Sequence, residues 1–491
     1  MNIATKKGYT TYQNTISLVY LKAARDVLGD VAIEIDNSLN KGFYTLPIDG
    51  TEITEEQVKA IDKKMEEIIK ADLPIITKTY SKEDALRLCD ENGLFIRKRM
   101  IEEYDESATV DFCTLDGYSN YFYGDMAAST GKVKNYEVRK YDDGILLRYP
   151  YHTHPDRMPE YVDDTKVHEA FVEAKRWQKL LGVTNLPDFN EKIRTGKAKE
   201  LILLSEALHE KKIAEIADMI AQRKKRIVLI AGPSSSGKTT TAQRLRIQLR
   251  VNGLDPICLG TDDYFVERSE SPIGEDGKPD YEGLDALDIN LFNNNMNDLL
   301  AGKEVDLPEF DFVSGTKIFG KRITSIREDQ PIIIEGIHAL NGKLTEFIDD
   351  NEKFKIYISP FTQLNIDLHN RVPTTDARML RRMIRDNKYR NRSAAGTIAQ
   401  WHQVRAGEDK NIFPFNGEAD VVFNTVLVYE LAIIKKYAQP ILQEIGEDEA
   451  EYDEAMRLLE FLERFETIED ETAIPNNSIL REFIGGSIFV E

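Results

Sequence analysis

The stretch Arg226-Ile-Val-Leu-Ile-Ala-Gly-Pro-Ser-Ser-Ser-Gly-Lys-Thr239 decides how the second half of this chain folds. Its first part is a short, continuous apolar run, which is typical of a strand covered on both faces. A glycine- and serine-rich turn follows, and then a helix-like segment at residues 240–249. Strand, turn and helix in this order provide the context in which the pattern G-x-x-x-x-G-K-[ST] is meaningful.

The glycine-rich turn is predicted to bind the phosphates of ATP. Its glycines let the backbone wrap around phosphate oxygens, and the helix N-terminus adds partial positive charge. We expect Lys238 to reach the β and γ phosphates and the Thr239 hydroxyl to bind Mg²⁺. The predicted ATP-binding residues of the turn are Gly232, Pro233, Ser234, Ser235, Ser236, Gly237, Lys238, Thr239 and Thr240.

A second anchor is Glu335, which ends the apolar run Ile332-Ile-Ile334. An acid at the end of a buried strand beside a phosphate loop is predicted to be the carboxylate on the metal side. The alternative is an ordinary acid at a strand end. No guanine-reading NKxD motif follows, which argues against a GTPase.

Further apolar runs alternate with helical segments, and this alternation predicts the fold class. The runs are residues 256–259, 331–334, 355–358 and 420–423. Alternation of this kind predicts an α/β domain with a parallel sheet flanked by helices. The whole chain is predicted to divide into an α+β domain at 1–165, a helical connector at 166–222, the α/β domain at 223–430 and a helical tail at 431–491.

Composition limits the functions that remain. The chain has 491 residues, a formal net charge of -21 and three cysteines. Such an acidic protein is not expected to bind nucleic acids or anionic membranes in general. Few, widely spaced cysteines suit a reducing compartment, and no apolar stretch is long enough to cross a bilayer. The expected location is the cytoplasm.

Several segments after the phosphate loop resemble the uridine kinase and phosphoribulokinase family, in the family's order. They cover roughly residues 225–430. The segments are the acidic Asp262-Asp263-Tyr264-Phe265, then Tyr281-Glu282-Gly-Leu-Asp-Ala-Leu-Asp288, then Pro308-Glu-Phe310-Asp-Phe312-Val-Ser314, and an arginine-rich stretch with Arg378, Arg381, Arg382, Arg385, Arg390 and Arg392.

The resemblance implies an ATP- and Mg²⁺-dependent nucleoside kinase, and it suggests a homo-oligomer. Asp262 would accept the proton of the acceptor hydroxyl, with Asp263 as the competing choice. Lys238 and Arg385 would stabilise the transferred phosphoryl group, since guanidinium forks match phosphate oxygens. The arginines expected on ATP are Arg382, Arg390 and Arg392, and the expected substrate contacts are Asp262, Tyr264, Glu282, Phe310 and Phe312.

The acceptor base is where this sequence departs from the family. Positions that carry a hydroxylated aromatic and a histidine in uridine kinases read Phe310 and Gly315 here. Losing two polar contacts predicts a pyrimidine nucleoside kinase with relaxed base specificity. Two alternatives stay open: a kinase of another small alcohol, like phosphoribulokinase, and a nucleotide-switched regulatory protein that binds RNA.

Residues 14–155 resemble another family, the second additional domain of threonyl-tRNA synthetase, through Lys41-Gly-Phe-Tyr44, residues 54–65 and Asp111-Phe-Cys113. In that family an HxxxH pair, a cysteine and a later histidine form the editing site. Here Thr15 and Val19 stand at the pair, and a lone cysteine cannot hold a metal. The resemblance therefore implies the fold without the editing activity.

Overall fold

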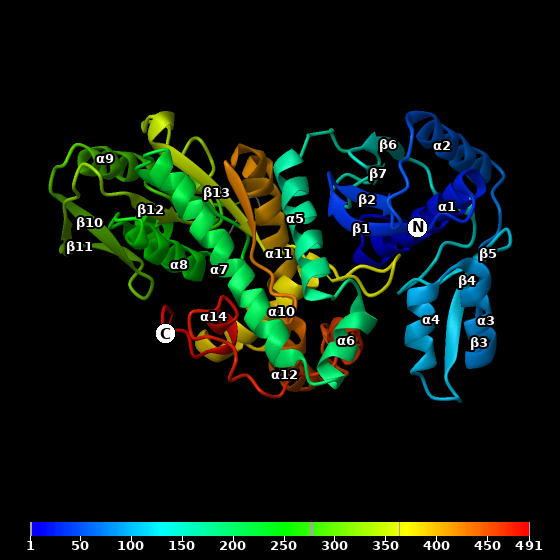
Figure 1. Ribbon diagram of the computed structural model, residues 1–491. Coiled ribbons are helices and arrows are strands. Elements are labelled where there is room, and N and C mark those ends of the chain that lie inside the picture. Colours follow the sequence, from blue (N-terminus) through cyan, green and yellow to red (C-terminus); the bar gives the residue numbers. More distant parts are fainter. Residues whose placement is uncertain (1, 275–276, 278, 363, 491) are drawn as a thin grey trace. The chain divides into compact units, whose positions relative to one another are not determined.

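The computed structural model describes all residues except 1, 275–276, 278, 363 and 491 (Figure 1). The chain forms two compact units. Unit 1 comprises Met1–Asp164, Gly182–Glu191 and Leu364–Val372, and unit 2 comprises Thr165–Leu181, Lys192–Gln363 and Pro373–Glu491. Within the described residues, no helix has the length and apolar character needed to cross a membrane.

Unit 1 is an α+β unit with two antiparallel sheets, ordered β1-β2-β7-β6 and β3-β4-β5. Its first helix starts at the N-cap residue Thr5, and its second starts with a capping box between Thr54 and Gln57. Its elements are α1 (Lys6–Leu28), β1 (Ile33–Leu39), β2 (Gly42–Pro47), α2 (Glu55–Lys70), β3 (Ile76–Ser81), α3 (Lys82–Asn92), α4 (Phe95–Glu102), β4 (Thr109–Leu115), β5 (Tyr118–Asn120), β6 (Glu137–Tyr141) and β7 (Gly144–Arg148).

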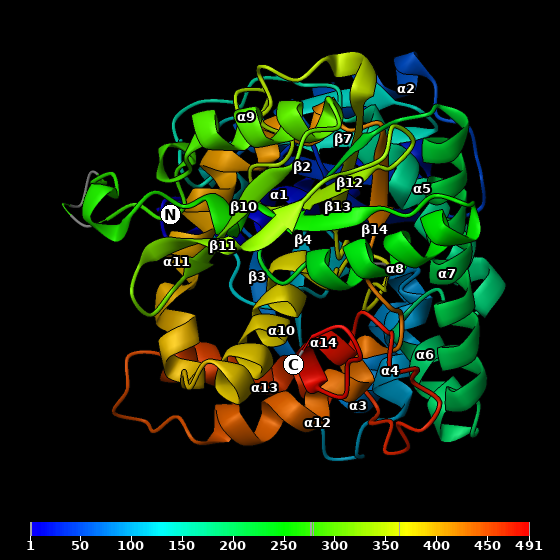
Figure 2. The same cartoon turned by 90° about the vertical axis from the view of Figure 1, so that its left-hand side faces the viewer.

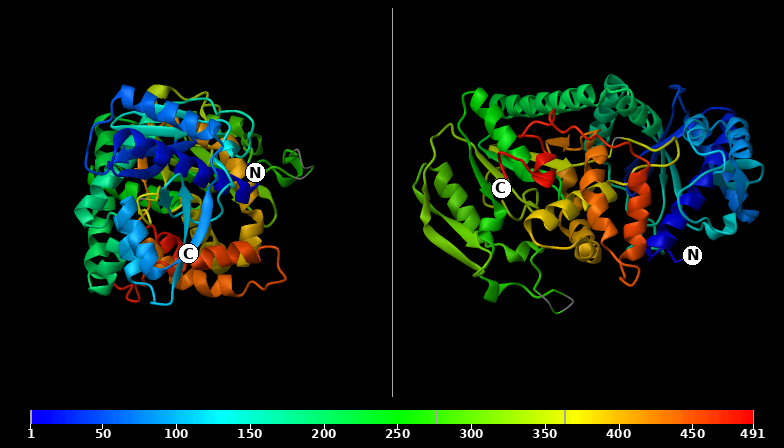
Figure 3. Two further views of the ribbon diagram at one scale, coloured as in Figure 1. Left: turned by 90° about the vertical axis from the view of Figure 1, so that its right-hand side faces the viewer. Right: turned by 90° about the horizontal axis from the view of Figure 1, so that it is seen from below.

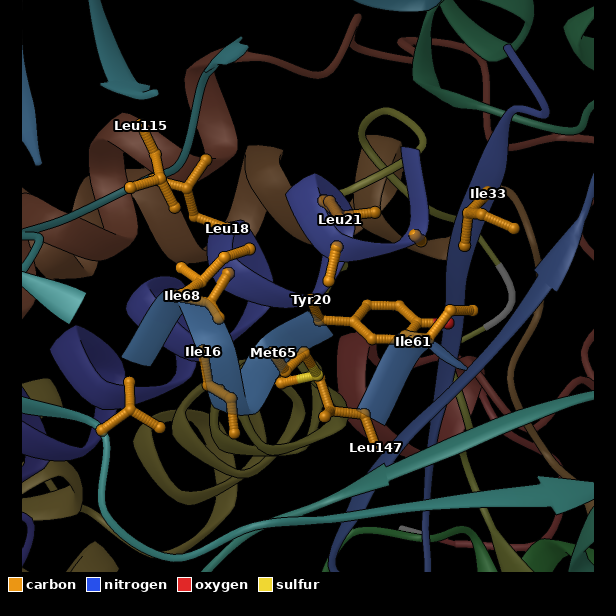
Figure 4. Close-up of a cluster of buried hydrophobic side chains, with 14 of the residues drawn as sticks. Ile16, Leu18, Tyr20, Leu21, Ile33, Ile61, Met65, Ile68, Leu115 and Leu147 are labelled. Carbon is orange, nitrogen blue, oxygen red and sulfur yellow. The ribbon is translucent and has the colours of Figure 1, made fainter. Parts of the chain in front are cut away.

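The core of unit 1 lies between α1, α2 and the strands that face them (Figure 4). Helix α2 contributes Val58, Ile61, Met65 and Ile68, and these are its four buried residues. Their spacing of three and four places them on one face of the helix, as expected of an amphipathic segment.

Unit 2 is built on a five-stranded parallel sheet in the order β14-β13-β8-β12-β9. All five residues of the central strand β8 are buried, because helices cover both faces of the sheet. The strands are β8 (Ile227–Ala231), β9 (Ile257–Gly260), β12 (Ile332–Glu335), β13 (Lys353–Ser359) and β14 (Val421–Asn424). The predicted α/β fold with a parallel sheet is confirmed.

Figure 2 shows α7 and α8 on one side of this sheet and α9 on the other. A separate antiparallel hairpin, β10 (Val305–Asp311) and β11 (Thr316–Thr324), extends from the sheet unit. The helices that belong wholly to unit 2 are α5 (Thr165–Leu181), α7 (Ala198–Gln222), α8 (Lys238–Val251), α9 (Ile289–Leu300), α10 (Thr374–Tyr389), α11 (Ala394–Asn411), α12 (Glu430–Gln443), α13 (Tyr452–Glu463) and α14 (Arg481–Ile484).

The two units are not continuous in sequence. The segment Leu364–Val372, between β13 and α10, belongs to unit 1 although the chain on both sides of it belongs to unit 2. The expected connector, residues 166–222, is also divided, because Gly182–Glu191 with most of α6 (Leu186–Arg194) joins unit 1. Residues 431–491 are part of unit 2.

Candidate active site

The phosphate loop connects β8 to α8, and its backbone has little free space. A Cβ on Gly232 would lie 2.3 Å from the carbonyl oxygen of Ile358. Gly237, the N-cap residue of α8, has a φ of 84°, a conformation that favours glycine. Ser235 also has a positive φ, 60°. The glycine positions of the motif are therefore required by this backbone.

Lys238 lies inside the loop. Its Nζ donates to the carbonyl oxygens of Gly232 at 3.0 Å and Pro233 at 3.3 Å. Burial lowers the pKa of Lys238, and the carboxylates of Glu335 and Asp262 work against this shift. An ammonium group held over the loop by weak neutral acceptors is available to bind a phosphate placed there.

Thr239 and Glu335 form a pair of oxygen donors beside the loop. The Thr239 hydroxyl donates to Oε1 of Glu335 at 2.8 Å. Burial raises the pKa of Glu335, while Lys238 and the Thr239 hydrogen bond lower it. Mg²⁺ prefers such oxygen ligands and usually takes one or two carboxylates plus phosphate oxygens. These two residues fit a nucleotide-bound Mg²⁺ and would hold it.

The two aspartates after β9 have different partners. Asp263 accepts from Arg322 at 2.6 Å and from the backbone N–H of Phe310 at 3.4 Å. Asp262 has an exposed side chain that is nevertheless crowded by protein atoms. This crowding raises its pKa; Lys238 acts to lower it and Asp263 raises it further. The charge of Lys238 therefore acts on Asp262, whereas Asp263 is paired with Arg322.

Glu282 faces the same group of charges. Enclosure by neighbouring atoms raises its pKa, with Arg382 and Lys238 lowering it and Asp262 raising it. The backbone oxygen of Glu282 accepts from the side chain of Asn411 at 2.9 Å. The charges of Arg382, Lys238 and Asp262 therefore act on Glu282, which is one of the predicted substrate contacts.

Three of the predicted arginines converge on one buried acid, Asp386, whose exposed fraction is 1%. Arg385 donates to it at 2.8 and 3.0 Å, and the guanidiniums of Arg382 and Arg390 lie 3.2 and 3.6 Å from it. The Arg392 guanidinium pairs with Gln400 instead, although the backbone N–H of Arg392 donates to the carbonyl oxygen of Asp386 at 3.1 Å. Asp386 was not predicted, although its position four residues after Arg382 and four residues before Arg390 was a usable signal.

Arg378 and Arg381 donate hydrogen bonds to backbone oxygens of the phosphate loop. Arg378 is 1% exposed, pairs with Glu408 and donates to the carbonyl oxygen of Ser234 at 3.2 Å. Arg381 is fully buried, pairs with Glu430 at 2.5 Å and donates to the carbonyl oxygen of Ser235. These two arginines of the basic stretch therefore shape the phosphate loop.

The backbone N–H and the hydroxyl of Ser234 also have hydrogen-bond partners. Its backbone N–H donates to Glu408 at 3.0 Å, and its hydroxyl accepts from Arg382 at 2.8 Å. Glu408 lies on α11 and is buried. Nothing in the sequence pattern indicated that Glu408 contacts the phosphate loop, because the partners of an acidic residue on a helix are set by the tertiary fold.

The predicted acceptor residues separate into two groups. Phe310 and Phe312 pack with Phe265, with ring centroids 5.2 Å apart for Phe310–Phe312 and 5.6 Å for Phe265–Phe310. Phe312 is 58% exposed. Tyr264 instead is 1% exposed and packs on Phe292, and its hydroxyl accepts from Asn295. Tyr264 therefore has the surroundings of a core residue.

Gly315 has a φ of 74°, and a Cβ there would lie 2.7 Å from the Arg268 side chain. Arg268 donates to the carbonyl oxygens of Phe312 at 2.6 Å and Val313 at 3.3 Å. The space beside Gly315 is thus occupied by the Arg268 guanidinium, which is distant in sequence and follows from no local pattern. The position that lacks the family's histidine therefore has the Arg268 side chain beside it.

Known proteins resemble the part of the chain that carries this site. Residues 227–432 match the phosphoribulokinase/uridine kinase family. A uridine kinase of Staphylococcus aureus (strain JH9) is 32% identical over 198 residues, which are 40% of this chain and 86% of that protein.

Two solved structures are similar at lower identity. A possible uridine kinase from Bacillus stearothermophilus is 22% identical with a TM-score of 0.28, covering 43% of this chain and 99% of that one. A D-glycerate 3-kinase from Cryptococcus neoformans is 12% identical with a TM-score of 0.22, covering 55% and 88%. With TM-scores this low, the family assignment depends on the sequence matches. The chain belongs to the phosphoribulokinase/uridine kinase family of kinases.

Proposed function

We propose that this protein transfers the γ-phosphoryl group of ATP, with Mg²⁺, to the 5′-hydroxyl of a pyrimidine nucleoside. The proposal is based on one observation, the different partners of the two aspartates Asp262 and Asp263. Asp263 is bound to Arg322, while Asp262 shares its electrostatic surroundings with Lys238 at the phosphate loop. One free carboxylate beside a phosphate site is what transfer to an alcohol requires.

The residues of the chain have separate tasks in this reaction. Asp262 accepts the proton of the acceptor hydroxyl while the new O–P bond forms and the bond between the γ-phosphorus and the leaving ADP breaks. Lys238 and the arginines around Asp386 neutralise the charge on the transferred group. Thr239 and Glu335 would hold Mg²⁺, which would supply charge neutralisation when bound with ATP. The raised pKa of Asp262 makes it a better proton acceptor than an ordinary aspartate.

The acceptor base would be selected by apolar contact more than by hydrogen bonds. Phe310 offers a ring face for stacking but no hydroxyl, and Gly315 offers no side chain. An apolar site discriminates between related ligands by only about 10–200-fold. We therefore propose relaxed specificity, in which uridine is accepted and a 5-methyl base such as thymidine is tolerated. Arg268, beside Gly315, limits how bulky that base can be.

The test is an ADP-release screen across uridine, cytidine, thymidine, ribose and small sugar alcohols. Turnover with pyrimidine nucleosides and little with ribose supports the proposal. Turnover with a sugar alcohol and none with any nucleoside would show that the pocket serves a non-nucleoside acceptor. We further propose that the protein acts in the cytoplasm as a homo-oligomer, which light scattering of the purified protein would check.

For unit 1 we propose a packing role for the residues that stand at the editing positions. The Thr15 hydroxyl donates to the carbonyl oxygen of Thr11 and accepts from the backbone N–H of Ala127. Val19 is fully buried in the core. Among the described residues, no group of three or more His, Cys, Asp or Glu side chains could hold a metal ion.

A further inference from the structure

The C-terminal segment, residues 474–485, lies outside the part of the chain that matches the family, yet it packs on the phosphate loop. Ile479 is fully buried in the core of the sheet unit. Its Cγ2 lies 2.6 Å from the position that a Cβ on Gly237 would take. The closeness of this contact means that Ile479 limits where the loop backbone can lie.

Glu482 of the same segment caps the helix that begins at the loop. Its Oε2 accepts from the backbone N–H of Thr240 at 3.3 Å and from the Thr240 hydroxyl at 2.7 Å. The N-cap residue of α8 is Gly237, which makes no side-chain cap. The first backbone N–H groups of a helix have no acceptor within the helix, and an N-cap side chain commonly accepts a hydrogen bond from one of them. Here the acceptor comes from a residue more than two hundred positions away in the sequence.

The C-terminal segment also holds α10, the helix that carries the arginines around Asp386. Lys388 donates to the carbonyl oxygen of Ile484 at 2.7 Å, and the Arg381 guanidinium lies 5.0 Å from the Phe483 ring centroid. Figure 2 and the right-hand view of Figure 3 show the segment beside α10. One segment thus contacts both elements that would enclose the phosphates.

We propose that Glu482 is a positioning residue for the phosphate loop and that residues 474–485 are an integral wall of the nucleotide site. The proposal rests on the proposed function only in that the loop binds nucleotide phosphates. The charge of Glu482 also favours the charged form of Lys238 and raises the pKa of that lysine. Its hydrogen bonds fix the first turn of α8, so the loop amides point at a bound phosphate without reorganisation.

The experiment measures the Kd of ADP by calorimetry for the full chain and its variants. Glu482→Ala leaves two buried donors of Thr240 without their acceptor, and we expect the Kd to rise about tenfold. In Glu482→Gln the amide oxygen still accepts, so the Kd should stay within about threefold of wild type. In kinetics, the KM for ATP should rise more than kcat falls, which a merely structural residue would not produce.

The matched control is Glu471→Gln. Glu471 bonds Arg481 and Tyr437 in the same region without contacting the loop, so this variant should keep the ADP Kd unchanged. A Glu482→Ala protein that binds ADP as tightly as wild type, or more tightly, overturns the proposal. So does a Glu482→Gln variant as weak as Glu482→Ala. If Glu482→Ala does not fold, Glu482→Asp replaces it, and an unchanged Kd there is equally contrary. ADP binding needs no acceptor, so the result is independent of which alcohol is phosphorylated.

Discussion

The nucleotide side of the candidate site is held far more firmly than the acceptor side. On the nucleotide side, Arg381 is fully buried and donates to the loop backbone, and Asp386 gathers three arginines while only 1% exposed. On the acceptor side, Phe312 is 58% exposed and Glu282 is exposed as well.

The difference in burial indicates that residues on the nucleotide side are needed for the fold, whereas residues on the acceptor side can be substituted. Breaking a buried ion pair leaves an unpaired charge and costs several kcal/mol, so the phosphate loop cannot vary without harming the fold. Exposed side chains on a hairpin can change with little effect on stability. We therefore expect chemistry to depend on the nucleotide side and substrate choice on the acceptor side.

The largest expected effect is that of Lys238→Ala. Among the residues that the structure describes, the ammonium donates hydrogen bonds to carbonyl oxygens of its own loop, so the fold should survive its removal. Loss of its charge should lower kcat by about 10³-fold or more. Steady-state ADP release, with circular dichroism as the fold control, measures this. Turnover within about tenfold of wild type would contradict the phosphate-loop assignment.

Asp262→Asn should lower kcat by about 10²-fold or more and leave the KM for ATP almost unchanged. Because the pKa of Asp262 is raised, wild-type kcat/KM should rise with pH through an acid limb that lies above the ordinary aspartate range. That limb should be absent in the variant. Asp263→Asn is the matched control, and it should weaken the Arg322 contact and stability more than kcat. Greater sensitivity of kcat at Asp263 would reverse the assignment of the base.

On the acceptor side, the ratio of kcat/KM for uridine to that for thymidine should stay below about 200. Phe310→Tyr restores a hydroxyl next to the base and should increase this ratio, while kcat with uridine changes little. A wild-type preference above about a thousandfold would show that other residues, such as Arg268, read the base by hydrogen bonds.

A smaller effect concerns stability and pH in unit 2. His209 is fully buried, and burial lowers its pKa to about 3, while its Nε2 lies 2.9 Å from the Val426 carbonyl oxygen. Between pH 6.5 and 3 the unfolded chain therefore binds a proton that the folded protein does not. Stability is lost as the pH falls through this window, by up to about 1.4 kcal/mol per pH unit.

His209→Gln removes this titration and keeps a donor for Val426. Denaturant unfolding at pH 6.5 and pH 5 should show the wild type losing about 1.6 kcal/mol more than the variant, since the unfolded histidine is already half protonated at pH 6.5. Equal losses in the two proteins would mean that His209 is not kept neutral by burial.

The last prediction concerns unit 1, for which we expect neither editing activity nor bound zinc. We expect no aminoacyl-tRNA deacylase activity and no stoichiometric zinc in unit 1, because Thr15 and Val19 are packed inside it. Metal analysis of the full chain tests this better than a fragment ending at residue 165, which would lack Leu364–Val372. One bound zinc per chain would contradict it.

Much of the sheet unit could be predicted from local pattern. The buried run of β8, the glycines of the loop and the acid at the end of β12 each follow from short-range requirements of a parallel sheet and a phosphate loop. The packing of Tyr264 in the core and the guanidinium beside Gly315 could not be predicted this way. Both depend on which segments meet in space.

The sequence by itself determined the α/β class, the position of the phosphate loop and the kinase family, because spacing along the chain carries that information. Only the tertiary structure decided that Asp263 serves Arg322, that Asp386 collects the arginines and that Glu482 caps α8. Each of these contacts joins groups whose charge and burial are set by folding. The sequence does not distinguish an acidic residue that acts as a base from one that pairs with arginines or caps a helix. The partners that the residue gains on folding determine its role.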